Sequence, residues 1–367
     1  MHYTFVGAIQ GDIMTVNIDE VWSDFEMDGL EEQLKTFFPE SSVDLEKIIT
    51  QIFSGDVLGG IVSVFRMITG DLGNTLNSMR QVFIWILVLG IVATLISQFV
   101  DIFDNHMIAD IGFYFTYLLM TAVLMRSYIN IAETAGEAIE NIVHFIQIFI
   151  PAFFLSVGLA AGSTTAAAGY ELVLILIYLV EYVLNLLVLP MVYSYVMLSF
   201  VNGIWTEDKL ALLVEGMEKI IRFALKGLLG LVTGVSALQS MITPAIDSVK
   251  NTALQKTIAA IPGVGDMADG VMDMVIGSAV VIKNGIGIVF LLFLLAVAAA
   301  PLLMILFQTI LFKVAAALLG IVSDKRITNC TDKIGTGSKL LFDTVGTSVL
   351  MFLIVISVAV YSTNRGY

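Results

Sequence analysis

Residues Val82–Val100 form a run of nineteen without one charged side chain, and similar apolar runs recur as far as Tyr361. The hydrocarbon core of a bilayer is about 30 Å thick, and an α-helix crosses it in roughly 20 residues. Because backbone polar groups at that depth must be hydrogen-bonded within their own segment, repeated runs of this length predict an all-α, polytopic helical membrane protein. The composition agrees, since 58% of the residues are hydrophobic and only 14% are charged.

Seven apolar runs are long enough to cross a bilayer. The predicted spans are Val82–Val100, Ile108–Met125, Ile142–Ala161, Leu172–Val201, Ile220–Ile242, Gly285–Val322 and Thr344–Tyr361. Lys and Arg alternate between the ends of these spans, which favours seven crossings with the N-terminus on the cytoplasmic side. Pro190 leaves an alternative open, because a split of the fourth span there would reverse the orientation of everything downstream.

The chain divides into an acidic N-terminal head, residues 1–80, and a polytopic membrane domain, residues 81–367. The head holds thirteen Asp and Glu residues against four Lys and Arg. Apolar residues at helical spacing from Leu45 to Phe53 predict one amphipathic helix, and Val57–Ile68 predicts another that lies on the membrane or on a partner. The acidic excess argues against nucleic acid as a partner, because nucleic acid requires a basic surface.

Nothing in the sequence predicts catalysis. Cys330 is the only cysteine and the three histidines are scattered, so no metal cluster is expected. The segment from Gly335 to Lys339 imitates a phosphate-binding loop, but its glycine spacing is wrong and no strand is predicted before it. We therefore expect no catalytic residue, no metal and no cofactor.

Small residues line one face of the fifth predicted span. Gly227, Gly230, Gly234 and Ala237 follow one another at spacings of three, four and three, and Gly158 with Gly162 forms a second motif of this kind. Small residues at such spacing allow membrane helices to approach closely. The contact is either packing within one chain or association between copies.

Residues 243–284 predict a re-entrant or interfacial helical hairpin, because proline and glycine interrupt the apolar pattern. The expected hinges are Pro244, Pro262, Gly263 and Gly265, with a further hinge at Pro301. Broken helices at membrane depth often line a cavity. The candidate pathway-lining residues of this region are Asp247, Asp266, Asp269, Asp273, Lys283 and Asn284. The alternative is a surface hairpin whose carboxylates are simply solvated.

Glu181 is a further candidate, because it lies inside the apolar run of the fourth span. Tyr178 and Asn185, three and four residues away, share its helix face. A carboxylate near the bilayer centre costs about 3 kcal/mol, so Glu181 is expected to face water or a partner. It either lines a pathway with Asn185 or forms a structural hydrogen bond.

The region after Gln239 resembles the stage III sporulation protein AE family. The residues that carry the resemblance are Gln239, Pro244-Ala245-x-Asp247, Ile261-Pro262-x-x-Gly265, Asp269, Asp273, Gly277-Ser278, Lys283-Asn284-x-x-Gly287, Pro301-Leu-Leu, Ala315-Ala-Ala-Leu318 and Ser323-Asp324. The layout of an acidic head before a multispan body is also similar. Members commonly begin with a signal-like segment, which the start of this sequence does not resemble; a cleaved segment would put the head between two membranes, contrary to the charge pattern.

The resemblance implies a channel or permease component of the complex that joins mother cell and forespore, located in the outer forespore membrane. It also implies partners: the other proteins of the stage III sporulation A operon, including a secretion-type ATPase and ring-forming components, together with membrane lipid and further copies of the chain. The alternative is a non-conducting scaffold that docks the ATPase and the ring proteins. A conventional secondary transporter would show inverted repeats, and the sequence shows no convincing duplication.

Overall fold

The computed structural model describes most of the chain after residue 105 and isolated parts before it. The described residues are 4–9, 12–17, 48, 51, 56, 58–63, 80–81, 83–88, 90–92, 94–95, 106–161, 163–204, 209–258 and 265–362. The acidic head therefore lies largely outside the described residues, whereas the predicted span Val82–Val100 is described, as helix, at 83–88, 90–92 and 94–95.

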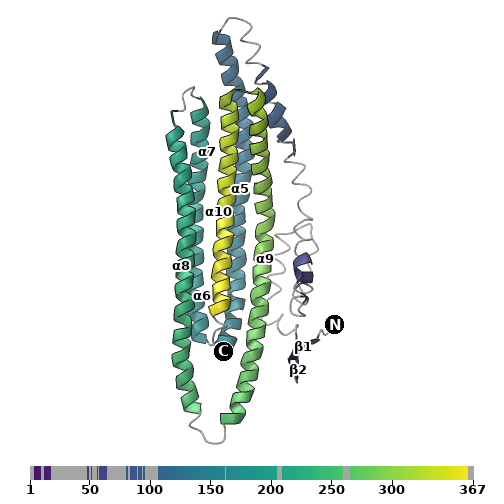
Figure 1. Ribbon diagram of the computed structural model, residues 1–367, viewed down its shortest axis with the longest axis vertical. Helices are drawn as coiled ribbons and strands as arrows, with labels where there is room; N and C mark the ends of the chain where they lie inside the picture. The colour runs from purple at the N-terminus through teal and green to yellow at the C-terminus, as the bar shows by residue number, and fades with distance from the viewer. Residues whose placement is uncertain are drawn as a thin grey trace.

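Five helical rods stand side by side, each antiparallel to the one before it (Figure 1). They are α5 (His106–Ala161), the joined elements α6 (Ser163–Val183), η1 (Leu184–Val188) and α7 (Leu189–Ile204), then α8 (Ala211–Ile258), α9 (Gly265–Val322) and α10 (Lys325–Ser362). The apolar content and the short connections that follow α5 and α9 produce this up-and-down bundle. The helical membrane class predicted from the sequence is confirmed.

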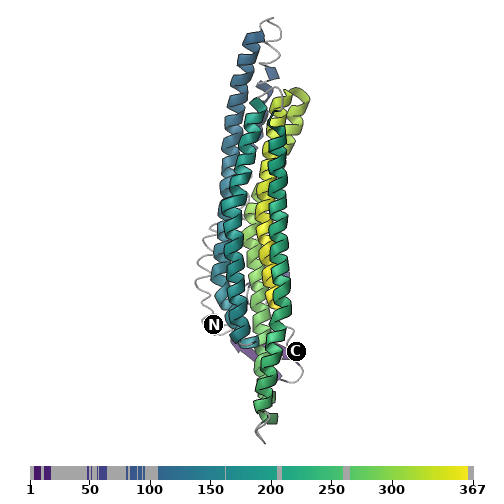
Figure 2. The ribbon, with the colours of Figure 1, turned by 90° about the vertical axis from the view of Figure 1, so that its left-hand side faces the viewer.

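The rods are arranged so that α10 contacts each of the others. It packs against α9 and α8 most extensively, and also against α7 and α5. The α5 and α6–α7 rods lie on one side of the bundle, and α8 and α10 lie on the opposite side, as Figures 1 and 2 show together. α5 and α8 share few contacts, so each has an outward face on its own side of the bundle.

The helix α5 differs from the prediction. Ile108–Met125 and Ile142–Ala161, expected to be separate spans, are the two ends of one helix of 56 residues, about 84 Å long. The intervening segment is rich in Ala and Glu, which are strong helix formers, and has neither proline nor a turn sequence. Polar composition suggested a loop, but helix propensity and packing against α9 keep the segment helical.

Five helices of the described part are long and apolar enough to cross a membrane. They are Tyr114–Gly158, Gly169–Ile204, Ala211–Gln239, Lys283–Val322 and Lys325–Val360. The predicted number of seven is not reproduced here, partly because two predicted spans are fused in α5. Each rod exceeds the length of about 20 residues that a bilayer core requires.

The strands β1 (Thr4–Ile9) and β2 (Asp12–Asn17) depart from the all-α prediction. They pair antiparallel with Thr4 opposite Asn17 and Ile9 opposite Asp12. The sequence between them is Gln10-Gly11, a two-residue connection whose glycine is typical of tight hairpins. The Gln10-Gly11 pair was not recognised as a hairpin connection, because the head was interpreted from helical periodicity alone.

Aromatic side chains fill the core between α5 and α9. The rings of Phe149 and Phe290 stack with their centroids 4.4 Å apart, and Phe145 and Phe153 lie beside Phe290 at 5.6 and 6.4 Å. All four side chains are at most 1% exposed. Offset ring contacts of this kind stabilise beyond the area that they bury.

Candidate functional site

One end of the bundle contains a layer almost free of charge. Its uncharged stretches are residues 141–161 of α5, 227–242 of α8, 285–300 of α9 and 344–361 of α10. Contacts show that these stretches lie at similar heights, because the space beside Gly287 is bounded by Val360 and Phe153, and the space beside Gly169 of α6 by Phe154 and Gln239. The stretch in α5 is about 30 Å long, the thickness of a hydrocarbon core. We therefore take this layer as the part of the bundle that meets the hydrocarbon.

α6 carries two glutamates at this layer: Glu171, whose neighbour Tyr170 contacts Phe154 of the α5 stretch, and Glu181, which is ten residues further along and lies near the edge of the layer. Tyr178 and Tyr182 beside it are 60% and 67% exposed, Asn185 is exposed, and Glu181 itself is partly exposed. The structural hydrogen bond that was the alternative to a pathway role is not formed within the described part, where Glu181 has no hydrogen bond or ion pair. A polar group thus faces outward from the bundle where lipid would otherwise be.

The π-helix η1 helps to turn Asn185 outward. Pro190 has no N–H to donate to the carbonyl of Leu186, so the regular α-helical ladder cannot continue there. The wider turn of η1 accommodates this, and the three consecutive residues from Asn185 to Leu187 are all exposed. Single π-helical turns of this kind are frequent at functional sites.

The small-residue face of α8 points away from the bundle. A Cβ atom added at Gly227, Gly230 or Gly234 would meet nothing within 4 Å, and Ala237 is exposed. The three glycines are therefore not packed within the described chain and are available to another molecule. By contrast, a Cβ at Gly158 would lie 3.5 Å from the Cβ of Ala166, so Gly158 packs at the turn from α5 to α6; Gly162 lies outside the described residues.

The predicted hairpin, residues 243–284, is continuous with the rods. α8 runs through Pro244 to Ile258, and α9 begins at Gly265 and continues through Pro301 to Val322. These two rods extend beyond the others at one end of the bundle (Figure 1). The prediction of two separate short helices was wrong, because α8 continues through Pro244. Pro262 and Gly263 lie outside the described residues.

The candidate carboxylates of this region remain predictions. Asp247 lies on α8, and Asp266, Asp269 and Asp273 lie on the first turns of α9, but their side chains are outside the described part. Lys283 is fully buried and Asn284 is half-buried. These two residues therefore lie inside the bundle, against the expectation that they face a pathway.

Two polar clusters that the sequence reading did not find connect α10 to its neighbours. Arg222 of α8 donates from Nη1 to Oδ2 of Asp343 at 2.7 Å and from Nε to Oε1 of Glu218 at 3.1 Å. Lys313 of α9 donates from Nζ to Oδ1 of Asp332 at 2.8 Å and to the hydroxyl of Thr336 at 2.7 Å. No short-range motif marks pairs so distant in sequence.

We expect Arg222→Leu to destabilise the bundle by about 1 kcal/mol, because Asp343 and Glu218 lose a shared cation. The side chains are about a third exposed, so water screens much of the loss. Thermal unfolding of the purified chain in detergent would measure it. The double variant Arg222→Leu with Asp343→Leu should recover part of the loss; an additive double variant would contradict a direct coupling.

Glycines on α10 have a packing role. A Cβ at Gly337 would overlap the side chain of Val196 on α7 and meet Cε2 of Tyr128 at 3.4 Å. A Cβ at Gly335 would lie 3.2 Å from the stem of Lys313. The segment that imitated a phosphate-binding loop is thus a helical surface where α7 and α9 approach α10 closely.

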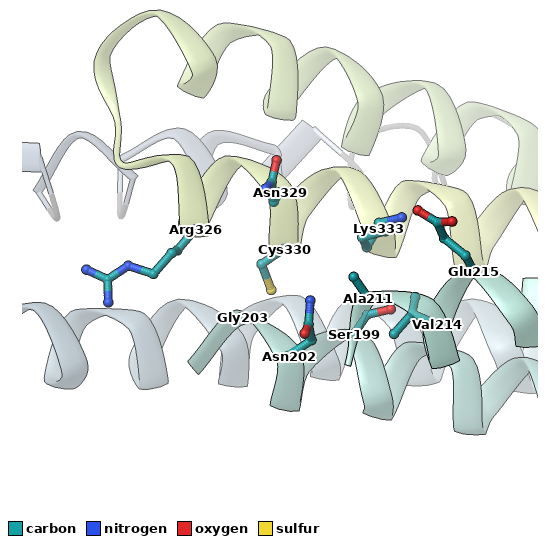
Figure 3. A pocket seen from close by; sticks show the side chains of 10 residues that line it. All are labelled: Ser199, Asn202, Gly203, Ala211, Val214, Glu215, Arg326, Asn329, Cys330 and Lys333. Carbon is teal, nitrogen blue, oxygen red and sulfur yellow. The ribbon is translucent and has the colours of Figure 1, made fainter. Parts of the chain in front are cut away.

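A pocket of about 140 Å³ lies where α7 ends and α8 begins, against α10 (Figure 3). Arg326, Lys333 and Glu215 line it, and Arg326 Nε lies 3.3 Å from Oδ1 of Asp324. The sulfur of Cys330 points into the pocket. The described residues contain no group of three His, Cys, Asp or Glu side chains that could hold a metal ion.

Comparisons with known proteins agree with the resemblance found in the sequence. The family model of stage III sporulation protein AE matches residues 43–363. The chain is 24% identical over 280 residues to stage III sporulation protein AE of Bacillus subtilis (strain 168), which covers 76% of this chain and 70% of that protein. No solved structure matches the chain.

Proposed function

The chain belongs to the stage III sporulation protein AE family, and from that membership we propose that it is a subunit of an oligomeric membrane conduit between mother cell and forespore. Its family supports a role in sporulation, and the five long apolar helices of its described part support a location in a membrane. The proposed location is the outer forespore membrane. The proposed partners are the other proteins of the stage III sporulation A operon, including the secretion-type ATPase and the ring-forming components.

The observation that supports a conduit is the outward position of Glu181 and its polar neighbours within the uncharged layer. A carboxylate exposed to hydrocarbon costs about 3 kcal/mol at the bilayer centre on the lenient scale, and a smaller cost applies to Glu181 near the edge of the layer. Exposed Tyr178, Tyr182 and Asn185 beside Glu181 add polar atoms to the same face of α6. Water or another subunit must cover this face in the membrane, and a water-filled path between subunits supplies the water.

We expect Glu181→Gln to reduce forespore gene expression at the late stage several-fold while the abundance of the protein stays unchanged. Glutamine keeps the shape and the hydrogen-bonding capacity of the side chain but removes its charge, and an exposed position should tolerate the change. A reporter of late forespore transcription, with immunoblotting of the membrane fraction, would measure both quantities.

The matched control is Glu215→Gln, an exposed carboxylate on α8 outside the uncharged stretch of that helix. A cysteine at Asn185 in a Cys330→Ala background should also react with a membrane-impermeant thiol reagent in assembled complexes, as should one at Asp269. Wild-type reporter activity in Glu181→Gln together with an unreactive Asn185→Cys would favour the non-conducting scaffold instead.

A further inference from the structure

The outward face of α5 is acidic over two turns. Glu133, Glu137 and Glu140 are all exposed on it, and Asn130 and His144 continue the same face at helical spacing. None of the three carboxylates has an ion-pair partner among the described residues. Glu133 and Glu137 stand four residues apart, where like charges repel along a helix. This row of charges, here named the acidic face, is therefore unfavourable in an isolated bundle.

The outward face of α8 carries basic residues in its first half, followed by glycines further along the helix. Lys219 and Lys226 are exposed, and Gly230 and Gly234 follow on the same face at steps of four residues. Arg222 is occupied by Asp343 and Glu218, whereas neither lysine forms an ion pair within the part of the chain that is described. These four residues, Lys219, Lys226, Gly230 and Gly234, are here named the basic face.

The helices α5 and α8, which carry the two faces, stand on opposite sides of the bundle. In Figure 2, α5 stands at the left edge and α8 at the front right, and Figure 1 places α5 behind α10 and α8 at the far left. α5 and α8 run in the same direction, because the chain reverses direction twice between them. A second copy with the same orientation in the membrane therefore meets α8 with its α5 parallel.

The heights of the two faces also agree. Arg222 is level with Asp343, which it contacts, and Asp343 follows Gly337 by six residues on α10. Gly337 adjoins Tyr128, so residue 134 of α5 is roughly level with Arg222, within about one helical turn. Glu133 and Glu140 are seven residues apart, as are Lys219 and Lys226. The carboxylates of Glu133 and Glu140 thus have the same spacing along the helix, and about the same depth in the bundle, as the ammonium groups of Lys219 and Lys226.

We propose that the acidic face of one copy binds the basic face of a second copy, in a head-to-tail contact that repeats around a ring. Residues related by a rotation about the membrane normal keep their depth, so matched heights are what a cyclic assembly requires. Gly230 and Gly234 leave room for the neighbour's α5 just below the charged pairs. Lipid headgroups could neutralise the lysines but would not neutralise the carboxylates. The contact does not depend on conduction, because a scaffold could use it equally well.

The test is charge reversal of one face at a time in the full chain, purified in detergent micelles. The acidic-face variant carries Glu133→Lys and Glu140→Lys, and the basic-face variant carries Lys219→Glu and Lys226→Glu. Each variant alone should lose the oligomer, measured as mass by light scattering, because two like-charged faces then meet. Mixed together, the two variants should recover the oligomer, since every contact in an alternating ring pairs opposite charges.

The control is Glu171→Lys, which makes the same change on α6, outside both faces, and should leave the oligomer intact. Either reversed variant that keeps the wild-type mass overturns the proposal. Reversed variants that dissociate but do not reassemble when mixed overturn it as well, because another partner or lipid then accounts for the charges. Circular dichroism confirms that each variant is helical before it is scored.

A second measurement does not depend on reversed charges. Glu137→Cys and Lys226→Cys, combined in a Cys330→Ala background, lie on opposite sides of one chain and can form a disulfide only between copies. Oxidation should give a ladder of linked chains on a denaturing gel, whereas Glu171→Cys with Lys226→Cys should give none. A folded, oligomeric variant that stays unlinked overturns the proposed contact.

Discussion

Replacing Gly337 with leucine should destabilise the bundle by about 3 kcal/mol, because α7 and α5 approach α10 at this residue with no space for a side chain. Even a Cβ atom would overlap Val196, and Tyr128 and Tyr195 close the remaining sides. Overpacking a close-packed core costs about 1 to 3 kcal/mol, and a buried helix–helix contact stands at the upper end of that range. Thermal unfolding of the purified protein in detergent, followed by circular dichroism, would measure the loss.

The matched control for this variant is Gly346→Ala on the same helix. A Cβ there would lie 4.0 Å from Cδ2 of Leu302, an ordinary van der Waals distance, so alanine should be tolerated. If Gly337→Leu unfolded at the same temperature as Gly346→Ala and the wild type, the close approach of α7 to α10 would be wrong.

Phe290→Ala should cost about 4 kcal/mol, since it removes the ring on which three aromatic side chains of α5 converge. Phe290 is fully buried and stacks on Phe149 with their centroids 4.4 Å apart. Truncation of a buried phenylalanine costs about 3 to 5 kcal/mol, because the cavity that remains cannot collapse fully. Unfolding in detergent would again provide the measurement.

The comparison for Phe290→Ala is Phe307→Ala, seventeen residues further along α9. Phe307 is 38% exposed, so its loss should cost much less. Equal losses in the two variants would mean that the aromatic cluster between α5 and α9 is not a core contact.

The class of fold could be predicted because apolar runs determine it, but the lengths of the rods could not. Residues 126–141 contain Arg126 and three glutamates, which suggested a loop between two spans. The bundle retains them in α5 because only one face of a helix must be apolar, and the polar side chains occupy the outward face. A hydropathy pattern averages over both faces and cannot make that distinction.

The candidate site was predicted in part. Glu181 was found because a charge in an apolar run is conspicuous, and the outward glycines of α8 were found through their spacing. Which way each face points depends on neighbours far away in sequence, as the pairing of Arg222 with Asp343 illustrates. Gly337 was missed for the same reason: its importance comes from Val196, and no local pattern connects the two.

The position of α10 has a consequence for biosynthesis. α10 is the last of the described helices in chain order, yet it contacts α9, α8, α7 and α5. Until α10 enters the membrane, Arg222 and Lys313 lack their acceptors on Asp343 and Asp332. The surfaces of the earlier helices that pack against α10 are also uncovered until then. The earlier helices can insert in order as the ribosome releases them, and α5 can pack against α6 and α9 before α10 arrives. The ion pairs of Arg222 with Asp343 and of Lys313 with Asp332, together with the packing of α8 and α9 on α10, form only when synthesis reaches this last helix, so the earlier helices wait for it in a partly assembled bundle.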